Sequence, residues 1–188
     1  MTNSDTEVDV LVISQFFSPE GIGGGYRWEQ FSNHLPDEFN CRVLCPPPTY
    51  PFGEFDRTFK PIQWEQRDDL KVTRLWTYQP ASDSRANDSH ASRMLNYGIF
   101  AVFASLYVLV NFWRYDTVVT MSSPHTTFLP GIVAKGLRRR WVVDVFDLWA
   151  DNAEDFGYAD ESSLALRIVR WLERSAMVRS DAVIVITE

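Results

Sequence analysis

The sequence has few of the residues on which metal sites and disulfide frameworks depend. Its two cysteines, Cys41 and Cys45, lie close together, and no secretory signal precedes them. We therefore expect buried free thiols in a reducing compartment rather than a disulfide. The three histidines, His34, His90 and His125, are scattered, so zinc-ligand spacing is missing and no bound metal is expected.

Positive charge is also scarce. The chain has 18 Lys and Arg against 25 Asp and Glu, which gives a formal net charge of −7. An acidic chain of this kind argues against nucleic acid as a partner. The length of 188 residues fits one α/β domain with a sizeable core.

An early stretch, Val8–Tyr26, predicts a strand, a glycine loop and a helix. Val8–Ile13 is nearly all apolar, as in a central strand covered on both faces. A polar loop leads to Gly23, Gly24 and Gly25, after which apolar residues recur at helical spacing. Glycines let a backbone approach a ligand, and a helix start offers unpaired N–H groups, so the stretch indicates a phosphate cradle. A flexible turn is the alternative.

Two common nucleotide-binding signatures are missing. No G-K-[ST] follows the glycines, which excludes a mononucleotide P-loop. The second predicted strand ends in Leu44–Pro46 without an acidic residue to hold a ribose, which disfavours a dinucleotide-dependent dehydrogenase.

The remaining apolar patterns alternate between strands and helices. The predicted strands are Cys41–Cys45, Leu70–Tyr78, Asp116–Met121, Trp141–Phe146 and Asp181–Thr187, and the clearest predicted helices are Met94–Trp113 and Leu164–Val178. With the first strand, this order predicts one α/β domain over residues 1–188. We expect a Rossmann-like, mainly parallel sheet of about six strands with helices on both faces.

Met94–Trp113 runs for twenty residues without a charge, between Arg93 and Arg114. Its length alone would suit a transmembrane helix. One span would, however, put the strands before and after it on opposite sides of a bilayer, where they could not form one sheet. We therefore expect a helix that packs on the sheet and leaves one face for a membrane surface.

Two strand ends supply further candidate site residues. Asp147 follows the strand Trp141–Phe146, at the end of the strand where open α/β sheets place their sites. A helix-capping aspartate is the competing interpretation. Tyr50 lies in the proline-rich loop Pro46–Gly53, which is either a simple turn or one wall of an acceptor site.

Several motifs follow one another along the chain in a fixed order. They are Phe17–Gly25, Pro48–Gly53, Val72–Tyr78, Arg93–Tyr97, Ser123–His125, Phe146–Asp151, Trp171–Arg174 and Asp181–Glu188. Together they resemble the N-terminal half of family-4 GT-B glycosyltransferases of the colanic acid and O-antigen biosynthesis type. Phe146 and Ala150 depart from the family pattern, which has Arg and Pro at these positions.

The resemblance implies an enzyme that transfers a sugar from a nucleotide-sugar to a lipid-linked or glycan acceptor in cell-envelope polysaccharide or glycoconjugate biosynthesis. It implies a retaining reaction without a further cofactor, peripheral attachment to the cytoplasmic face of the cell membrane, and no nucleic-acid partner. In such an enzyme Asp147 would be catalytic, and Gly23–Gly25 would bind the donor phosphates. The acceptor side would comprise Glu20, Tyr50, Ser123, His125 and Trp149.

The family's second domain, which binds the donor, carries an E-x7-E signature that does not occur here. We therefore expect the donor domain to be absent and the chain to be inactive without it, with a separate donor domain as a candidate partner. The alternative is a non-catalytic Rossmann-like binding module or an inactive truncated fragment.

Overall fold

The computed structural model describes residues 7–21, 24–51, 54–67, 70–79, 90–146 and 164–185. Its strands are β1 (Val8–Ile13), β2 (Phe39–Cys45), β3 (Ile62–Arg67), β4 (Leu70–Leu75), β5 (Thr117–Met121), β6 (Arg140–Val145) and β7 (Ala182–Val185). Its helices are α1 (Gly24–Ser32), α2 (His90–Asn111), α3 (Phe128–Gly136) and α5 (Leu164–Arg179), with 3-10 turns η2 (Phe112–Arg114) and η3 (His125–Thr127).

The strands form one sheet in the order β3-β4-β2-β1-β5-β6-β7. All neighbouring pairs are parallel except β3 and β4, which are antiparallel. This arrangement confirms the predicted Rossmann-like, mainly parallel sheet. The chain leaves β1 toward β2 on one side and later returns to pair β5 on the other, so the strand order reverses between β1 and β5.

The predicted number of strands was one too low, because β3 was missed. Its side chains alternate between exposed and half-buried, with Ile62 and Trp64 facing solvent, so β3 has no buried apolar face. Ile62 and Trp64 alternate with polar residues as in a strand, but this alternation covers only four residues and its apolar side faces solvent. The strand predicted over Leu70–Tyr78 begins at the expected residue and ends at Leu75.

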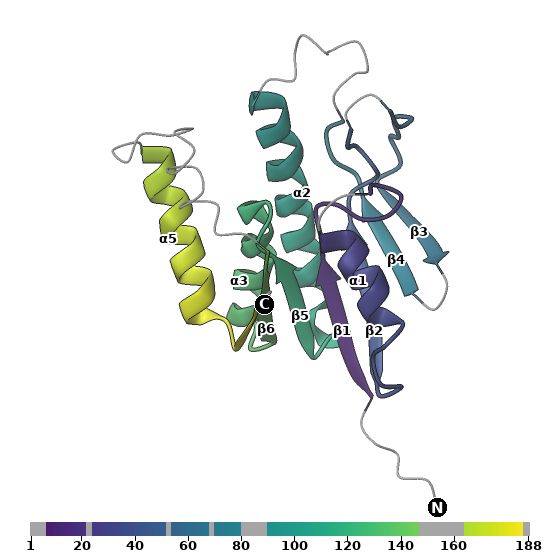
Figure 1. The fold of residues 1–188 in the computed structure, drawn as a ribbon, viewed down its shortest axis with the longest axis vertical. Helices are drawn as coiled ribbons and strands as arrows, with labels where there is room; N and C mark the ends of the chain where they lie inside the picture. The colour runs from purple at the N-terminus through teal and green to yellow at the C-terminus, as the bar shows by residue number, and fades with distance from the viewer. Residues whose placement is uncertain are drawn as a thin grey trace, which may run out of the picture.

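Helices cover both faces of the sheet (Figure 1). On one face, Trp28 of α1 packs with Val12, Val43 and Val119 of three central strands. On the other face, which we call the α2 face, α2 and α3 pack on β1 and β5, and α3 and α5 pack on β6. At the β6 contact a Cβ on Gly131 of α3 would lie 2.0 Å from Trp141 Nε1, so this close packing requires glycine.

Helix α2 packs against the sheet along one side only. Phe100, Ala104 and Val108 are fully buried on the sheet side, whereas Val102 and Val110 are about half exposed on the opposite side. Ala91–Arg114 is the one helix in the described residues that is long and apolar enough to cross a membrane, and 28% of its most apolar window is buried. Because β4 and β5, which flank α2 in sequence, belong to one sheet, α2 does not span a bilayer in this fold. Figure 1 shows its first turns reaching past the tips of β1 and β5.

Candidate functional site

The reversal of strand order places several loops around one position at the carboxyl edge of the sheet. The loop after β1 and the loop after β2 lie on one side of this position, and the turn after β5 lies on the other. Open α/β sheets bind ligands in the crevice at such a switch point. Four predicted site residues that the structure describes lie in these segments: Glu20, Tyr50, Ser123 and His125.

Glu20 ties the first two loops together. Its Oε1 accepts hydrogen bonds from the backbone N–H groups of Thr49 and Tyr50, both at 2.7 Å, and its Oε2 accepts one from Phe17 N at 3.2 Å. The side chain is buried, and this burial raises the pKa of Glu20, although the three backbone hydrogen bonds oppose the rise. Glu20 therefore shapes the site by holding backbone, and it brings Tyr50 next to the loop after β1.

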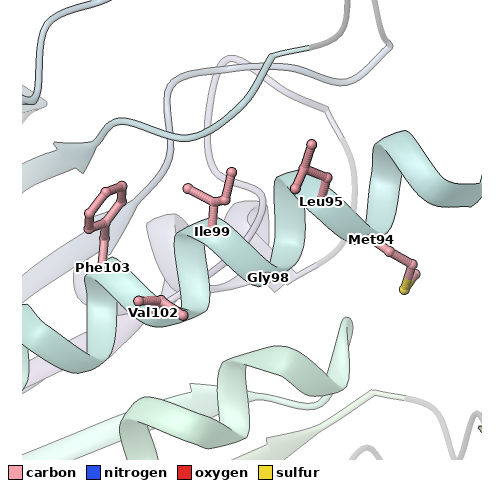
Figure 2. Close-up of a pocket in the computed structure, with 6 residues that line it drawn as sticks. All are labelled: Met94, Leu95, Gly98, Ile99, Val102 and Phe103. Atoms are coloured by element: carbon pink, nitrogen blue, oxygen red, sulfur yellow. The ribbon is translucent and has the colours of Figure 1, made fainter.

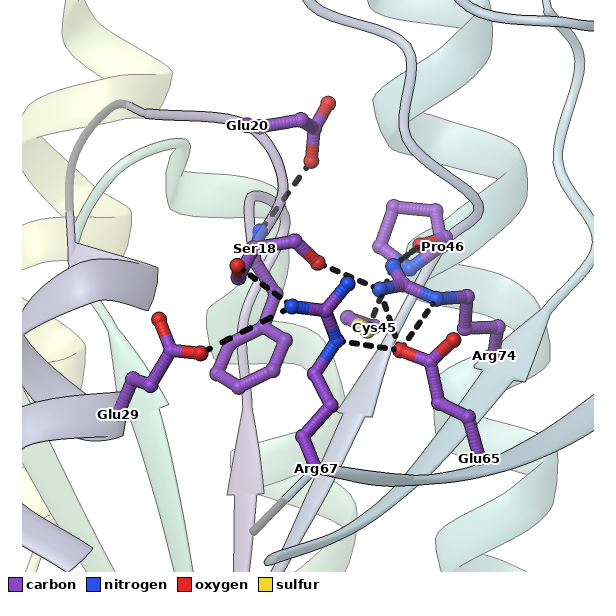
Figure 3. Close-up of polar contacts among 9 residues, drawn as sticks. Ser18, Glu20, Glu29, Cys45, Pro46, Glu65, Arg67 and Arg74 are labelled. Atoms are coloured by element: carbon purple, nitrogen blue, oxygen red, sulfur yellow. Dashed lines mark hydrogen bonds and ion pairs between the residues drawn. The ribbon is translucent and has the colours of Figure 1, made fainter.

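Arg74 of β4 lies between the same two loops and forms hydrogen bonds to both (Figure 3). Its guanidinium donates to Ser18 O at 2.6 Å and to Pro46 O at 2.9 Å, one carbonyl from each loop. It also forms an ion pair with Glu65 of β3, with 2.7 Å between Nη2 and Oε1. Arg74 is buried, and these contacts provide the partners that a buried charge requires.

Glu65 is shared between two arginines. It also accepts from Arg67 Nε at 3.1 Å, and Arg67 Nη1 donates to Ser18 Oγ at 2.8 Å. Partial burial alone would raise the pKa of Glu65, but the hydrogen bonds and charges of Arg74 and Arg67 outweigh it and lower the pKa. We call the loops Ser14–Glu20 and Pro46–Tyr50, with the charged side chains that hold them, the braced wall.

An aromatic row extends from the braced wall to α2. The ring of Phe16 meets those of Tyr50 and Tyr97 edge to face, each with 6.0 Å between centroids. Next to Tyr97, Asn96 is fully buried, accepts from Gln15 Nε2 at 2.8 Å and donates to Tyr78 O at 2.6 Å. The start of α2 is thereby fixed to the loop after β1, and Tyr50 remains partly exposed at the end of the row.

The opposite side of the switch point is the turn after β5, residues Ser122–Thr127, which we call the β5 turn. Ser122 Oγ accepts from Phe146 N at 2.9 Å, which joins this turn to the end of β6. Thr127 Oγ1 donates to Met121 O and Pro124 O. His125 Nε2 lies 2.5 Å from Oε1 of Glu173 on α5, so α5 is attached to the β5 turn through this pair.

The glycine stretch is described only in part. Gly24 is the first residue of α1 and Gly25 the second. A Cβ on Gly25 would lie 2.2 Å from Phe16 O and 2.6 Å from Phe17 Cα, so a close approach of α1 to the loop after β1 requires glycine there. The predicted phosphate contact at these glycines remains a prediction, and Gly23, Asp147 and Trp149 lie outside the described residues.

Asp144 of β6 is a buried carboxylate that the sequence analysis overlooked. Its Oδ2 accepts from Trp28 Nε1 at 2.8 Å, and its Oδ1 lies 3.1 Å from Arg27 Nη1, so it attaches α1 to β6. Burial raises the pKa of Asp144, although the Trp28 hydrogen bond and the Arg27 charge oppose the rise. Arg27 also lies over the rings of Phe31 and Phe146, the latter directly preceding Asp147.

Two chemical features of the described part of the chain are its possible metal-ligating side chains and its two cysteines. Among those residues, no three His, Cys, Asp or Glu side chains gather as a metal site would require. Burial raises the pKa of Cys45 and of Cys41 to about 12, so both remain protonated and unreactive at neutral pH. The predicted free thiols are therefore present, with Cys45 fully buried and Cys41 half-buried.

The strand order and the helices on both faces define a Rossmann-like domain. The family model described as "Glycosyl transferase 4-like domain" matches residues 23–188, and the chain belongs to this family. No curated protein matches the sequence.

One solved structure similar to the chain supports the fold assignment. The structure described as "Trehalose-6-phosphate from E. coli bound with UDP-2-fluoro glucose" is 10% identical, has a TM-score of 0.52, and covers 93% of this chain. The catalytic domain of starch synthase IV from Arabidopsis thaliana, bound to ADP and acarbose, is also 10% identical and covers 76%, with a TM-score of 0.46. The chain spans 39% and 34% of those two chains, respectively. Its fold is that of one Rossmann-like half of a GT-B enzyme.

Proposed function

We propose that this chain forms the acceptor-side half of a glycosyltransferase that moves a sugar from a nucleotide-sugar to a lipid-linked or glycan acceptor. Membership of the glycosyl transferase 4-like domain family over residues 23–188 is the observation that carries this proposal. The similar E. coli structure holds UDP-2-fluoro glucose, which supports a nucleotide-sugar as the donor. The cellular role proposed is the synthesis of envelope polysaccharides or glycoconjugates.

The donor would face the loop after β1 and the start of α1. Gly23–Gly25 would direct backbone N–H groups toward the leaving diphosphate, where the helix dipole also favours negative charge. Such fixed donors stabilise the charge that develops on a leaving group without reorganising. Asp147 would orient a sugar hydroxyl near this position, in a retaining reaction that needs no bound metal.

The acceptor would lie against the braced wall. Glu20 and Arg74 fix the backbone of both wall loops, and Tyr50 offers a partly exposed ring at their edge. A rigid wall suits an acceptor that must be held in one orientation for attack. Ser123 and His125 of the β5 turn would complete the acceptor side, together with Trp149.

The exposed side of α2 would rest on the cytoplasmic face of a cell membrane. Val102, Leu106 and Val110 on this side are each about half exposed. An apolar helix face of this length gains free energy when it enters the interface of a bilayer. Peripheral attachment would bring the site close to a lipid-linked acceptor.

Transfer would require a second, donor-binding domain. Stabilising a leaving nucleotide needs hydrogen-bond donors on both sides and exclusion of water, and the loops described above supply one side. We expect the 188-residue chain to bind nucleotide-sugars weakly and to show no transfer alone. A donor domain added as a separate chain should restore activity if it completes the cleft.

Calorimetry with several nucleotide-sugars and a transfer assay on lipid-linked and glycan acceptors test the proposal. In the reconstituted enzyme, Tyr50→Ala should raise the KM for the acceptor, whereas Tyr26→Ala, on the exposed side of α1, should not. Robust turnover by the chain alone would overturn the two-domain requirement. Binding of glycan or lipid without any transfer, even with a donor domain present, would favour a non-catalytic binding module.

A further inference from the structure

Helix α2 carries a notch on its exposed side, centred on Gly98. Figure 2 shows Leu95, Ile99 and Phe103 along one side of this hollow and Met94 and Val102 on the other. Its volume is about 350 Å³, and it is open to solvent. Every residue that lines it is apolar, so no hydrogen-bonding side chain faces an occupant.

The notch exists because one side chain is missing from a regular row. Met94, Gly98, Val102, Leu106 and Val110 follow one another at four-residue spacing, which places them along one face of the helix. A Cβ at Gly98 would meet nothing within 4 Å. Glycine is therefore not required by packing here, in contrast to Gly25 and Gly131, and it lowers the helix propensity of its position.

The notch lies within one helical turn of the candidate site. Asn96 is hydrogen-bonded to Gln15 directly after β1, and Tyr97 contacts Phe16, which contacts Tyr50 of the braced wall. Because these contacts fix the start of α2, a molecule seated in the notch has a fixed position relative to the site. One end of a long ligand can lie at Gly98 while its polar end reaches the carboxyl edge of the sheet.

The surroundings favour lipid over protein as the occupant. A protein partner would need polar groups at the rim, but Met94–Trp113 contains no charged residue. The helices of the α2 face also differ in charge from the acidic chain as a whole. Their basic residues are Arg93, Lys135, Arg167, Arg170, Arg174 and Arg179, with Arg114 in the adjoining turn η2. Lys135 is paired with Asp181, and the one acidic residue of these helices is Glu173, which contacts His125. This combination of apolar and basic side chains is complementary to an anionic lipid surface.

We propose that the Gly98 notch seats a hydrocarbon chain of a membrane lipid, and that the acceptor of this enzyme is therefore lipid-linked, its first tail segment lying along α2. This inference rests on the proposed glycosyl transfer for the role of the lipid, and it selects one of the two acceptor classes. The seat itself concerns binding and does not depend on transfer.

Photolabelling from within a bilayer tests the seat directly. The 188-residue chain is bound to vesicles of phosphatidylcholine and phosphatidylglycerol in which a small share of the phosphatidylglycerol carries a diazirine on one acyl chain. Trypsin cuts after Arg93 and Arg114, so the whole exposed face is recovered as the peptide Met94–Arg114. Tandem mass spectrometry then locates the label, which is expected on residues 94–103.

Two glycine variants separate a seat from general hydrophobic adhesion. Gly98→Leu fills the notch without a clash at Cβ, and Gly136→Leu adds the same side chain to an exposed position on α3 that is equally open. If the notch seats a chain, Gly98→Leu should retain vesicle binding but lower labelling of residues 94–103 by roughly tenfold, because a filled notch leaves no space for hydrocarbon. Gly136→Leu should label like the original chain, and Gly98→Ala should give an intermediate result. Thermal unfolding should show both helices intact, since leucine and alanine favour helix more than glycine does.

Unchanged or increased labelling in Gly98→Leu would overturn the seat while leaving membrane attachment in place. Failure of the original chain to bind vesicles would overturn both the seat and the proposed membrane contact. A stable dimer that protects Met94–Arg114 from the lipid label would instead assign the apolar face to a second copy of the chain. Failure of transfer in the reconstituted assay would contradict the proposed function without changing any of these labelling results.

Discussion

The two sides of the switch point are held together by different physical means. On the side of β2 and β4, a buried arginine and a buried glutamate bind the backbone of both loops of the braced wall. On the side of β5, hydroxyl groups close the β5 turn, and the His125–Glu173 pair attaches it to α5. The braced wall is internally complete, whereas the β5 turn depends on a helix that reaches it from another part of the chain.

If the chain has the proposed function, this difference would give the two sides of the site different roles. A wall fixed by buried charge presents the same surface with or without a ligand, which suits the orientation of an acceptor. A turn joined to a separate helix by one polar pair can adjust when that helix moves, because the cost of breaking the pair is modest. The predictions below test whether the two sides differ in this way.

Replacing Arg74 should have the largest effect. Arg74→Met leaves Glu65 without its buried partner and removes the donors to Ser18 O and Pro46 O, so we expect a loss of about 3 kcal/mol in the free energy of unfolding. Denaturant unfolding measures it. Arg57→Met is the matched control, since Arg57 is exposed over the Phe59 ring, and it should cost less than about 1 kcal/mol.

Arg74→Lys sharpens the same test. Lysine keeps the charge but lacks the planar guanidinium that reaches two carbonyls and a carboxylate at once. Arg74→Lys should therefore lower the free energy of unfolding by an amount between those for Arg74→Met and Arg57→Met. If Arg74→Met were no more costly than Arg57→Met, the braced wall would be held by its other contacts, those of Glu20, Arg67 and Asn96.

On the opposite side, His125→Ala should have a smaller and more local effect. We expect a loss of about 1 to 2 kcal/mol, as for one charged or polar hydrogen bond, with faster amide hydrogen exchange confined to α5 and the β5 turn. His34→Ala, at an exposed position near the end of α1, should change neither quantity. Loss of exchange protection across the whole sheet in His125→Ala would contradict the local attachment inferred here.

The fold was predictable because its central strands carry a strong local signal. The apolar runs of β1, β5 and β6 belong to strands covered on both faces, and such runs are rich in β-branched residues. β3 could not be found in the same way, because its position is fixed by antiparallel pairing with β4 rather than by burial. Its apolar residues, Ile62 and Trp64, lie on the exposed side, so burial in the core does not mark this strand.

The residues that hold the site were harder to recognise. Arg74 and Asp144 lie in strands that each carry a second charged residue, Lys71 in β4 and Arg140 in β6, so the sequence alone did not single them out. Their partners, Glu65 and Arg27, come from other elements, and no spacing rule predicts them. His125 and Glu173 are likewise brought together only by the packing of α5. The predicted roles of Glu20, Tyr50, Ser123 and His125 toward an acceptor remain predictions, although the structure shows that Glu20 acts first on the protein backbone.

A pH-dependent prediction concerns the attachment of α1 to β6. Burial raises the pKa of Asp144 above the value of 3.8 expected in the unfolded chain, so the folded chain binds more protons over the window above pH 3.8. The stability that this difference contributes is fully present below that pH and is lost as the pH rises through the raised pKa.

The Asp144→Asn variant lacks this titration. Its unfolding free energy, relative to the original chain, should therefore improve as the pH rises from about 4 to 7, which denaturant unfolding at each pH can measure. A relative stability of Asp144→Asn that falls over this range would show that Arg27 and Trp28 outweigh the burial of the carboxylate.

The smallest effect is expected at the outer edge of the β5 side, where Lys135 of α3 meets Asp181 ahead of β7. Lys135 Nζ and Asp181 Oδ1 are 2.5 Å apart, but both side chains are about 40% exposed, so solvent and salt screen their attraction. Lys135→Ala should therefore change the unfolding free energy by less than about 1 kcal/mol, and added salt should remove even that difference.

Asp181→Ala should cost more, because Asp181 Oδ2 also accepts a hydrogen bond from Trp141 N at 2.9 Å, at the start of β6. The excess of Asp181→Ala over Lys135→Ala should persist in salt, since it reports a backbone hydrogen bond rather than an ion pair. Equal losses for the two variants would show that the hydrogen bond from Trp141 N to Asp181 contributes nothing measurable to stability.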